Sequence, residues 1–520
     1  MILKLNNIID NIKSILFIVL GLSIPISVAF SNIIIIALTI LWLIEGKFQY
    51  KLKEILKNKW MLAIISLVMI YAIGLFWGEN DNSIWVIKRV SLLLFFLVLG
   101  TFNLEQSTLK RGLICFLTST MFSAVLAILI NFEVIFPLNN YLSIISSHSS
   151  LSAFTTYNYH NILLAFSAFI CLFILIETKT KFRLLLVLSI LIYTYSIFTE
   201  DGRAGQLLYI FLFGLYSFKW FKKKPQLFIL IITLLLTSNI IFYKYSKVFN
   251  DQVNNISEII KYDILDINNQ NKKYEDIRVT HTKHSFNHIK NKPFFGYGTG
   301  SYGSILKRTQ INNVDEIISF NKAEGGWHDH KKCEIQVFNL TSYSVDYNTQ
   351  FLGGDFIIND ETPYNRFIIR YREIGKEKWI YRRVTNEDIL NKGRKIGGLE
   401  TGKAYEWSIQ TLCNNKYNWK SDWIPGPNFI SKNVILKHTT PHNNYLYTFF
   451  ELGLLGLTSM ISIFLLQIKS LSNFKKNNFQ RILLTLGFMF IMLFDSYLFI
   501  FTLVCFYIYF YTIFSNYDFN

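Results

Sequence analysis

The side chains best suited to chemistry lie in residues 438–456, where a strongly apolar run opens with polar residues. His438 and His442 precede two asparagines, and the run then carries Glu451 within its apolar part. Ionisable side chains inside a membrane-spanning segment are costly and usually serve a function. We therefore take this membrane edge as the first candidate site.

His442 has the chemistry of a general base. Thr440 is suited to cap a helix and Pro441 to occupy its first position, which predicts His442 in the first helical turn. A helix N-terminus disfavours positive charge, so a neutral imidazole there could accept a proton from a hydroxyl, and nearby backbone N–H groups could hold an anion. The simpler alternative is a polar residue at the level of the lipid headgroups.

Glu451 follows nine residues later, about half a helical rotation away from His442. Together with Gly453 and Gly456 it favours a buried packing contact over a direct catalytic role.

A second candidate is the turn at residues 199–205, where Arg203 stands between two apolar runs. Its guanidinium could reach lipid headgroups, or it could bind a phosphate through two parallel hydrogen bonds. The sequence of this turn leaves both alternatives open.

A third group begins at Arg278 and continues with His281, His284 and His288, which would share one face of a helix. A metal site would lack a carboxylate partner here, so a solvent-exposed helix face is favoured. The glycine-rich run 296–300 has no preceding strand, which argues against a dinucleotide fingerprint. A loop and a phosphate-binding turn both stay open.

The composition indicates an integral membrane protein. Of the 520 residues, 51% are hydrophobic and 17% aromatic, and the apolar residues gather into long runs. We expect about twelve transmembrane helices, at residues 14–30, 31–44, 61–77, 86–101, 113–132, 162–176, 184–198, 206–218, 226–243, 443–468, 482–494 and 497–514. The first run lacks a cleavage site and is expected to be retained.

The formal charge of +17 does not indicate a nucleic-acid partner. Lysines and arginines gather in alternate short connections, which predicts that these connections and both termini are cytoplasmic. The same rule assigns the long polar segment before residue 441 to the outer face.

That outer segment contains a change of pattern at residues 333–431, where short alternating runs are separated by Gly, Asn and Asp turns, as in a β-sandwich. Residues 371–379 resemble the C to C′ hairpin of a fibronectin type III module, and residues 398–407 resemble its tyrosine-corner turn. Cys333 and Cys413 could form a disulfide in an oxidising compartment, or stay as two buried thiols. The predicted organisation is therefore membrane helices at 1–244, a helical part of the outer loop at 245–332, the sandwich at 333–431, and three more membrane helices at 432–520.

Four motifs in a fixed order resemble the O-antigen ligase and polymerase family of bacterial membrane glycosyltransferases. They lie at residues 159–161, 202–205, 278–302 and 441–456, and the twelve spans with one large loop before the tenth are similar too. The resemblance implies an all-α polytopic membrane protein with a fibronectin type III-like β-sandwich inserted in its large periplasmic loop. It further implies an enzyme of the inner membrane whose site faces the periplasm.

The resemblance also implies residue roles. Arg203 and Arg278 match arginines that hold the diphosphate of an undecaprenyl diphosphate-linked glycan donor, and His442 matches the residue that activates the acceptor hydroxyl. Supporting positions would be Asn161, Asn443, Glu451 and Arg89. The family's transfer is metal-independent and needs no cofactor.

The acceptor could be a lipid A core sugar, another lipid-linked glycan or a protein hydroxyl, and the sequence does not separate ligase, polymerase and protein glycosylation. The rival class is a transporter or flippase that does no chemistry. Such a protein is expected to hold charges near the bilayer midplane or to have helices that are broken there. This chain concentrates its arginines and histidines at the outer edge of the bilayer, which favours an enzyme.

Overall fold

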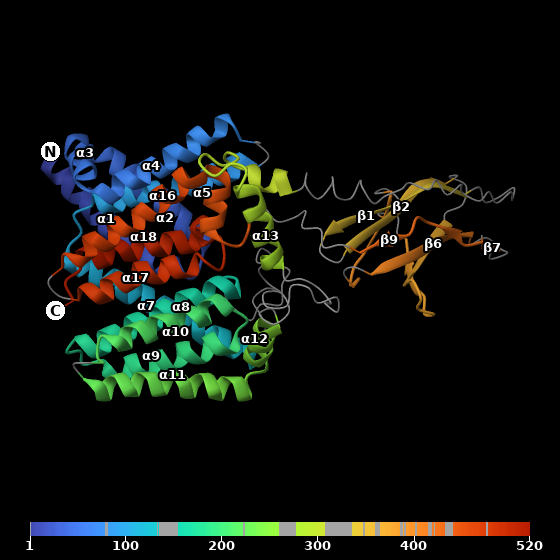
Figure 1. The fold of residues 1–520 in the computed structure, drawn as a ribbon. Helices are drawn as coiled ribbons and strands as arrows, with labels where there is room; N and C mark the ends of the chain where they lie inside the picture. Colours follow the sequence, from blue (N-terminus) through green and yellow to red (C-terminus); the bar gives the residue numbers. More distant parts are fainter. Residues whose placement is uncertain are drawn as a thin grey trace. The chain divides into compact units, whose positions relative to one another are not determined.

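The computed structural model describes residues 2–78, 82–132, 134, 154–221, 224–258, 277–306, 335–346, 349–358, 365–384, 388, 392–400, 403–413, 419–420, 422–431, 440–474 and 477–519. The chain divides into two compact units, and each is described by itself (Figure 1). The helical unit comprises Met1–Glu258, Ser285–Ser301 and Thr440–Asn520, and the second unit comprises Ile259–His284 and Tyr302–Thr439. Residues 285–301, which the sequence analysis assigns to the outer loop, thus pack with the helices.

The helical unit is built from helices that follow the apolar runs of the sequence. In chain order they are α1 (Ile2–Ser23), α2 (Val28–Ile44), α3 (Phe48–Lys57), α4 (Lys59–Ile73), η1 (Gly74–Phe76), α5 (Ser83–Ser91), η3 (Leu92–Leu94), α6 (Phe95–Gly100), α7 (Gln106–Asn131), α8 (Tyr157–Glu177), α9 (Arg183–Thr199), α10 (Arg203–Phe218), α11 (Pro225–Tyr245), α12 (Lys247–Glu258), α16 (Asn444–Ser472), α17 (Asn478–Ile491), η6 (Tyr497–Phe499) and α18 (Phe501–Asn516). Helix α13 (Ile277–Ile289) crosses the division between the two units.

These helices have the length and composition of a membrane protein. Among the described residues, six helical segments could cross a bilayer: Lys59–Phe76, Ser83–Gly100, Gln106–Asn131, Tyr157–Glu177, Pro225–Tyr245 and Asn444–Ser472. Helices α2 and α3, bent by 113° at their junction, make a seventh if they count as one span, and α9, α17 and α18 are shorter apolar helices. The predicted mainly helical membrane protein is confirmed at this level.

The first helix boundary differs from the prediction. The first predicted span ends at residue 30, whereas α1 ends at Ser23 and α2 begins at Val28. Pro25 lies in the intervening turn, and a proline disfavours helical conformation in the residue before it. Ser27 then caps α2, because its side chain accepts a hydrogen bond from the Phe30 backbone N–H at 3.2 Å.

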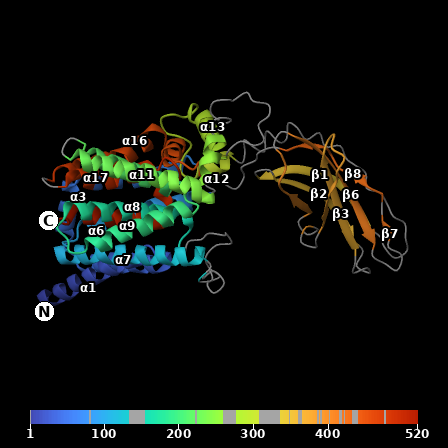
Figure 2. The same ribbon diagram turned by 90° about the horizontal axis from the view of Figure 1, so that it is seen from below.

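Two helices form the interior of the bundle. All residues of α18 from Thr502 to Phe514 are buried, and so are those of α8 from His160 to Phe173. A helix that is apolar on every side belongs inside a protein or membrane. Aromatic rings from neighbouring helices pack against α18, including Phe166 against Phe506 with ring centroids 4.9 Å apart. Figure 2 shows α8 beside its contact partner α9.

Helix α16 is broken at Gly453, where the backbone has φ 62° and ψ −158°. Residues 293–300, which we call the strap, hydrogen-bond to the groups that the break releases. Tyr297 N donates to Phe450 O at 3.0 Å and Gly298 N to Glu451 O at 2.7 Å, while Leu454 N donates to Pro293 O at 2.8 Å. Backbone groups inside a membrane protein need such internal partners, so the strap stabilises the break.

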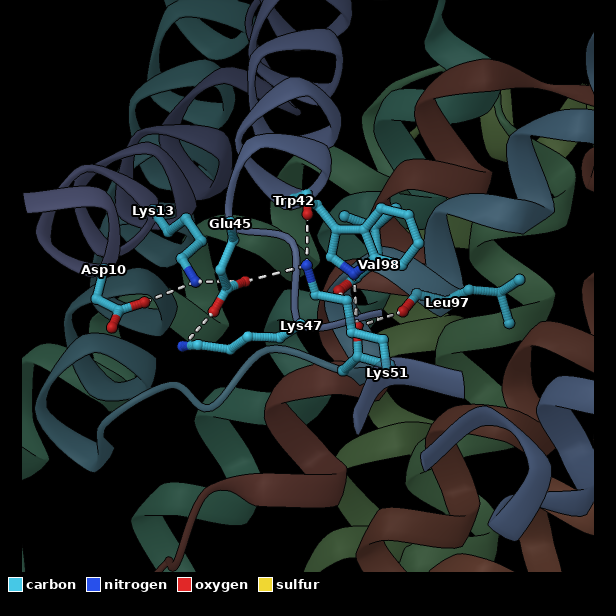
Figure 3. A network of polar contacts seen from close by, with 9 residues as sticks. Asp10, Lys13, Trp42, Glu45, Lys47, Lys51, Leu97 and Val98 are labelled. Carbon is cyan, nitrogen blue, oxygen red and sulfur yellow. Dashed lines mark hydrogen bonds and ion pairs between the residues drawn. The ribbon is translucent and has the colours of Figure 1, made fainter. Parts of the chain in front are cut away.

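A charged network holds the junction of α1, α2 and α3 (Figure 3). The Glu45 carboxylate at the end of α2 pairs with Lys13 at 3.1 Å, Lys47 at 3.0 Å and Lys51 at 3.2 Å. Asp10 pairs with Lys13 from the opposite side at 2.6 Å, and Lys51 also donates to the Trp42 carbonyl. The network fixes the bend between α2 and α3, because α3 supplies Lys51 and α2 supplies Trp42.

The second unit contains two antiparallel sheets. One has the order β1 (Ile335–Asp346), β2 (Thr349–Ile358) and β5 (Gly393–Ile396), and the other runs β4 (Ile380–Arg383), β3 (Asn365–Glu373), β6 (Ala404–Cys413) and β7 (Trp419–Lys420), with β8 (Ile424–Pro425) and β9 (Phe429–Ile430) also paired to β6. Inward side chains of both sheets share one core, in which Trp407 is 1% exposed. The Tyr405 hydroxyl accepts a hydrogen bond from Glu400 N at 3.0 Å, which is the contact of a tyrosine corner.

Candidate functional site

His442 lies just before a helix and not in its first turn, so the predicted helix start is wrong. The helix begins at Asn444, and Asn443 is its cap, because the Asn443 side chain accepts a hydrogen bond from Leu446 N at 3.0 Å. Asparagine is among the best capping residues, and it takes the role that the sequence analysis gives to Thr440. His442 itself has φ 53°, a left-handed conformation in which His is enriched among non-glycine residues.

The His442 imidazole contacts a carboxylate. Its Nδ1 atom lies 3.2 Å from Asp495 Oδ1, and the two side chains are 21% and 26% exposed. The same oxygen accepts a hydrogen bond from Ser496 N at 2.7 Å. With Asp495 ionised, His442 donates from Nδ1, and Nε2 becomes the basic nitrogen of the ring. A carboxylate that fixes the tautomer of a histidine is the arrangement of an oriented general base.

Two asparagines hold this pair together. Asn443 Nδ2 donates to Leu493 O at 3.0 Å, so the cap of α16 also binds the connection that carries Asp495. Asn444 N donates to Met492 O at 3.0 Å, and its side-chain oxygen accepts from Leu498 N at 2.9 Å. The start of α16 is thereby attached to both sides of Asp495.

Glu451 is fully buried and contacts the strap. Its Oε1 atom accepts a hydrogen bond from Gly300 N at 3.0 Å. This is a buried polar contact of the kind expected for it, and it connects α16 to the glycine-rich run. The strap continues to the end of α4, where Thr299 N donates to Gly74 O at 3.0 Å.

Arg203 is the first residue of α10 and is partly exposed. Two acidic residues precede it in the turn, but Glu200 pairs with His160 at 2.9 Å and Asp201 accepts from Gln252. Within the described part of the chain, no hydrogen bond or ion pair involves the Arg203 guanidinium. The charge of Arg203 is therefore available to a ligand.

Asn161 packs closely against the two glycines of the Arg203 turn. A Cβ at Gly202 or at Gly205 would collide with Asn161, so α10 can approach α8 this closely only with glycine at both positions. The Asn161 side chain also donates to Ile197 O at 3.3 Å.

Arg89 and Arg278 are the other predicted cations. Arg89 lies in α5 over the ring of Trp85, 5.4 Å from its centroid, and Tyr159 interacts electrostatically with both Arg89 and Asp495. Arg89 thus lies in the neighbourhood of the His442–Asp495 pair. Arg278 is an exposed residue in the first turn of α13 and belongs to the second unit.

Some predicted residues fall outside the described part of the chain. Cys333 and His438 lie there entirely, and the side chain of Cys413, at the end of β6, does too. The predicted disulfide stays untested. Among the other histidines, His281 Nδ1 lies 2.7 Å from the Tyr302 hydroxyl, within the second unit.

Two residues that pair with histidines in this region are not among the predicted site residues. Asp495 is not among the predicted site residues, although an acidic residue between the last two apolar runs is itself a signal of a polar site. His160 figured only as a motif position, yet it forms a buried pair with Glu200. Its position at the start of an apolar run, 40 residues before Glu200, gave no indication of which partner it takes.

Comparison of the chain with protein-family models and with curated proteins gives no match.

Proposed function

We propose that this protein is a membrane glycosyltransferase that moves a glycan from undecaprenyl diphosphate to an acceptor hydroxyl. The observation that carries the proposal is the His442–Asp495 pair, an oriented base at one end of an apolar helical bundle. The ordered motifs that resemble the O-antigen ligase and polymerase family agree with it.

In the proposed reaction, His442 accepts the proton of the acceptor hydroxyl and the arginines bind the leaving diphosphate. As the acceptor oxygen attacks the anomeric carbon, its proton passes to His442 Nε2, a new glycosidic bond forms, and the bond between that carbon and the diphosphate oxygen breaks. The leaving undecaprenyl diphosphate keeps the electron pair. Arg203 stabilises its charge through charge-assisted hydrogen bonds, and Arg278 receives the same role from the family's motif order.

In this proposal the chain crosses a bacterial inner membrane twelve times, through α1, α2, α4, α5 with α6, α7, α8, α9, α10, α11, α16, α17 and α18. The His442 end of the bundle faces the periplasm, because the basic connections that include Lys47 and Lys110 mark the cytoplasmic side. The second unit contributes a fibronectin type III-like sandwich on the periplasmic side. Its two sheets and the Tyr405 corner support that assignment.

Lipid A core sugar is the acceptor we favour, with a second lipid-linked glycan or a protein hydroxyl as alternatives. Deletion of the gene separates them. Loss of a ligase leaves full-length polymer on the lipid carrier, loss of a polymerase leaves single repeats, and loss of a protein glycosyltransferase changes only the modified proteins.

The direct test is transfer by purified protein in lipid nanodiscs, with an undecaprenyl diphosphate-linked glycan as donor and each acceptor class in turn. We expect Arg203→Lys and Arg278→Lys to weaken donor use by about 10- to 100-fold each, because lysine keeps the charge but loses the fork that binds phosphate. Lys88→Arg, an exposed change on the same helix as Arg89, is the control. Absence of transfer to every acceptor, from protein that is folded and binds donor, would contradict the enzymatic proposal and favour a transporter.

A further inference from the structure

A second acid–histidine pair, which is buried, holds the turn that precedes Arg203. His160 Nδ1 is 2.9 Å from Glu200 Oε2, and the side chains are 1% and 4% exposed. The pair is extended at both ends, since Ser123 Oγ lies 2.9 Å from His160 Nε2 and Ser196 Oγ donates to Glu200 Oε1 at 2.6 Å. Four side chains from α7, α8, α9 and the turn after α9 thus form one continuous hydrogen-bonded chain.

Ser123, His160 and Glu200 are hydrogen-bonded in the same order as the nucleophile, base and orienting acid of a catalytic triad. Ser123, however, is completely buried in α7. A nucleophile has to touch the reacting carbon, and the side chains packed around Ser123 exclude any substrate. The chain of hydrogen bonds is better explained as a device that holds backbone in place.

The backbone that it holds is the turn before Arg203. The Glu200 carbonyl accepts hydrogen bonds from Gly202 N at 3.1 Å and from Gln206 Nε2 at 3.3 Å, on the two sides of Arg203. Glu200 N donates back to Ser196 O at 3.0 Å. Glu200 therefore fixes the turn through its side chain and its main chain together.

The first turn of α8, which contains His160, also contacts the connection that carries Asp495. Tyr159, next to His160, packs edge-on against Tyr497, with ring centroids 6.4 Å apart. Tyr497 follows Asp495 by two residues. One helical turn, residues 159–161, thus contacts the Arg203 turn through His160 and Asn161 and the Asp495 connection through Tyr159.

We infer that the His160–Glu200 pair is a positioning pair, which sets the Arg203 guanidinium relative to the His442–Asp495 base. The inference rests on the proposed function, because it assigns the pair's role to donor binding. A buried polar group that loses its hydrogen-bond partner is destabilising, so loss of either side chain releases the turn. A catalytic geometry that shifts by about 1 Å can lose about 100-fold in rate.

The experiment combines two measurements on full-length protein in nanodiscs. Hydrogen–deuterium exchange of residues 199–206 reports the order of the turn directly, and donor kcat/KM reports its use. We expect Glu200→Ala and His160→Ala to speed exchange in this segment about 10-fold or more and to lower donor kcat/KM by about 10- to 100-fold, chiefly through a raised donor KM. The acceptor KM should not change.

Two further variants separate positioning from a general structural effect. Glu200→Gln should stay near wild type in both measurements, because the amide can donate to His160 Nδ1 while His160 donates from Nε2 to Ser123. Ser167→Ala, which removes a buried hydrogen bond of α8 to Thr120, should change neither. Should Glu200→Ala fail to fold, Ser196→Ala takes its place with an expected exchange effect of about 2- to 12-fold.

Unchanged exchange in both alanine variants would overturn the inference, and so would a Glu200→Gln variant as impaired as Glu200→Ala. Failure of the proposed function looks different. If exchange responds as expected while Arg203→Lys uses donor as well as wild type does, the turn is positioned by the pair but Arg203 does not bind the donor.

Discussion

At the scale of single residues, His442 and Asp495 act as a unit in which the carboxylate orients the imidazole. If the protein carries out the proposed glycan transfer, His442→Ala should lower its rate about 10²- to 10⁴-fold, the usual contribution of a positioned base. Asp495→Asn should lower it about 10- to 150-fold, the equivalent of one charge-assisted hydrogen bond. Both are measured as kcat in nanodiscs at matched protein content.

The control for this pair is His438→Ala, which removes the neighbouring histidine and should change kcat little. A His442→Ala variant with near wild-type kcat, or a more damaging His438→Ala, would show that the base has been wrongly assigned.

The sequence was enough to predict that His442 is a candidate site residue, but it did not indicate which residue it pairs with. His442 is recognisable because a histidine at the edge of an apolar run is rare. Its partner Asp495 lies 53 residues away, beyond two helices, and only the packing of α16 against α17 brings the two together. The helix start was misplaced because Thr440, Asn443 and Asn444 are all acceptable caps by residue type.

At the scale of helices, the break in α16 depends on Gly453. A Cβ there would collide with Phe294 of the strap, and φ 62° is unfavourable for alanine. We expect Gly453→Ala to lower the thermal unfolding midpoint in detergent and to reduce the proposed glycan transfer, because it displaces the half of α16 that follows His442.

Gly214→Ala is the matched control, since Gly214 lies inside α10, where an added Cβ would have no atom of the described residues within 4 Å apart from its own helix. Alanine is favoured over glycine by about 1 kcal/mol inside a helix, so this variant should be at least as stable as wild type. Equal destabilisation by the two changes would argue against a special role for the break.

The charged network around Glu45 predicts a pH dependence of stability. Burial raises the pKa of Glu45, but hydrogen bonds from Lys47 and Lys13 and the charges of Lys13 and Lys51 outweigh it, so the pKa lies below the ordinary value of 4.5. Because the folded-state pKa is lowered, the stabilisation is present above pH 4.5 and is lost as the pH falls through the folded-state value. Wild type should therefore lose more of its unfolding midpoint between neutral and acidic pH than Glu45→Gln does. Identical pH profiles would contradict this account of the network.

The existence of the helices could be predicted from apolar run length, whereas their interruptions could not. The length of an apolar run indicates a buried or lipid-facing segment, but it does not show whether the helix is continuous or broken within that segment. The strap contains one proline and three glycines, so the sequence predicts an irregular loop. Its pairing with α16 depends on backbone hydrogen bonds, which no side-chain pattern indicates. Three glycines in the strap have positive φ, and this conformational requirement, not phosphate chemistry alone, accounts for the glycine-rich run.

At the scale of the whole molecule, the second unit has a core of its own. Residues 333–431 expressed alone should give a β-rich far-UV spectrum and cooperative thermal unfolding, because the buried cluster around Trp407 lies within that segment. Trp407→Ala should cost about 3 to 5 kcal/mol of its unfolding free energy. Tyr381→Ala, at an exposed position of β4, is the control and should cost much less. A non-cooperative or helical product would contradict the autonomy of this segment.

The order of apolar and alternating segments along the chain was enough to predict a set of apolar helices and a separate group of β-strands. It could not show that residues 285–301 return to the helices before the strands begin. Neither length nor composition distinguishes a loop that stays in solvent from one that packs on a broken helix, because the decisive contacts involve backbone atoms.

The chain leaves the helical unit after Ser301 and re-enters it at Thr440. The strap, the break at Gly453 and the His442–Asp495 pair all lie outside this excursion. In evolutionary terms, residues 302–439 have the connectivity of a module that could be gained, lost or exchanged without rebuilding the bundle. Proteins with the same bundle are expected to vary most in length and sequence over this stretch.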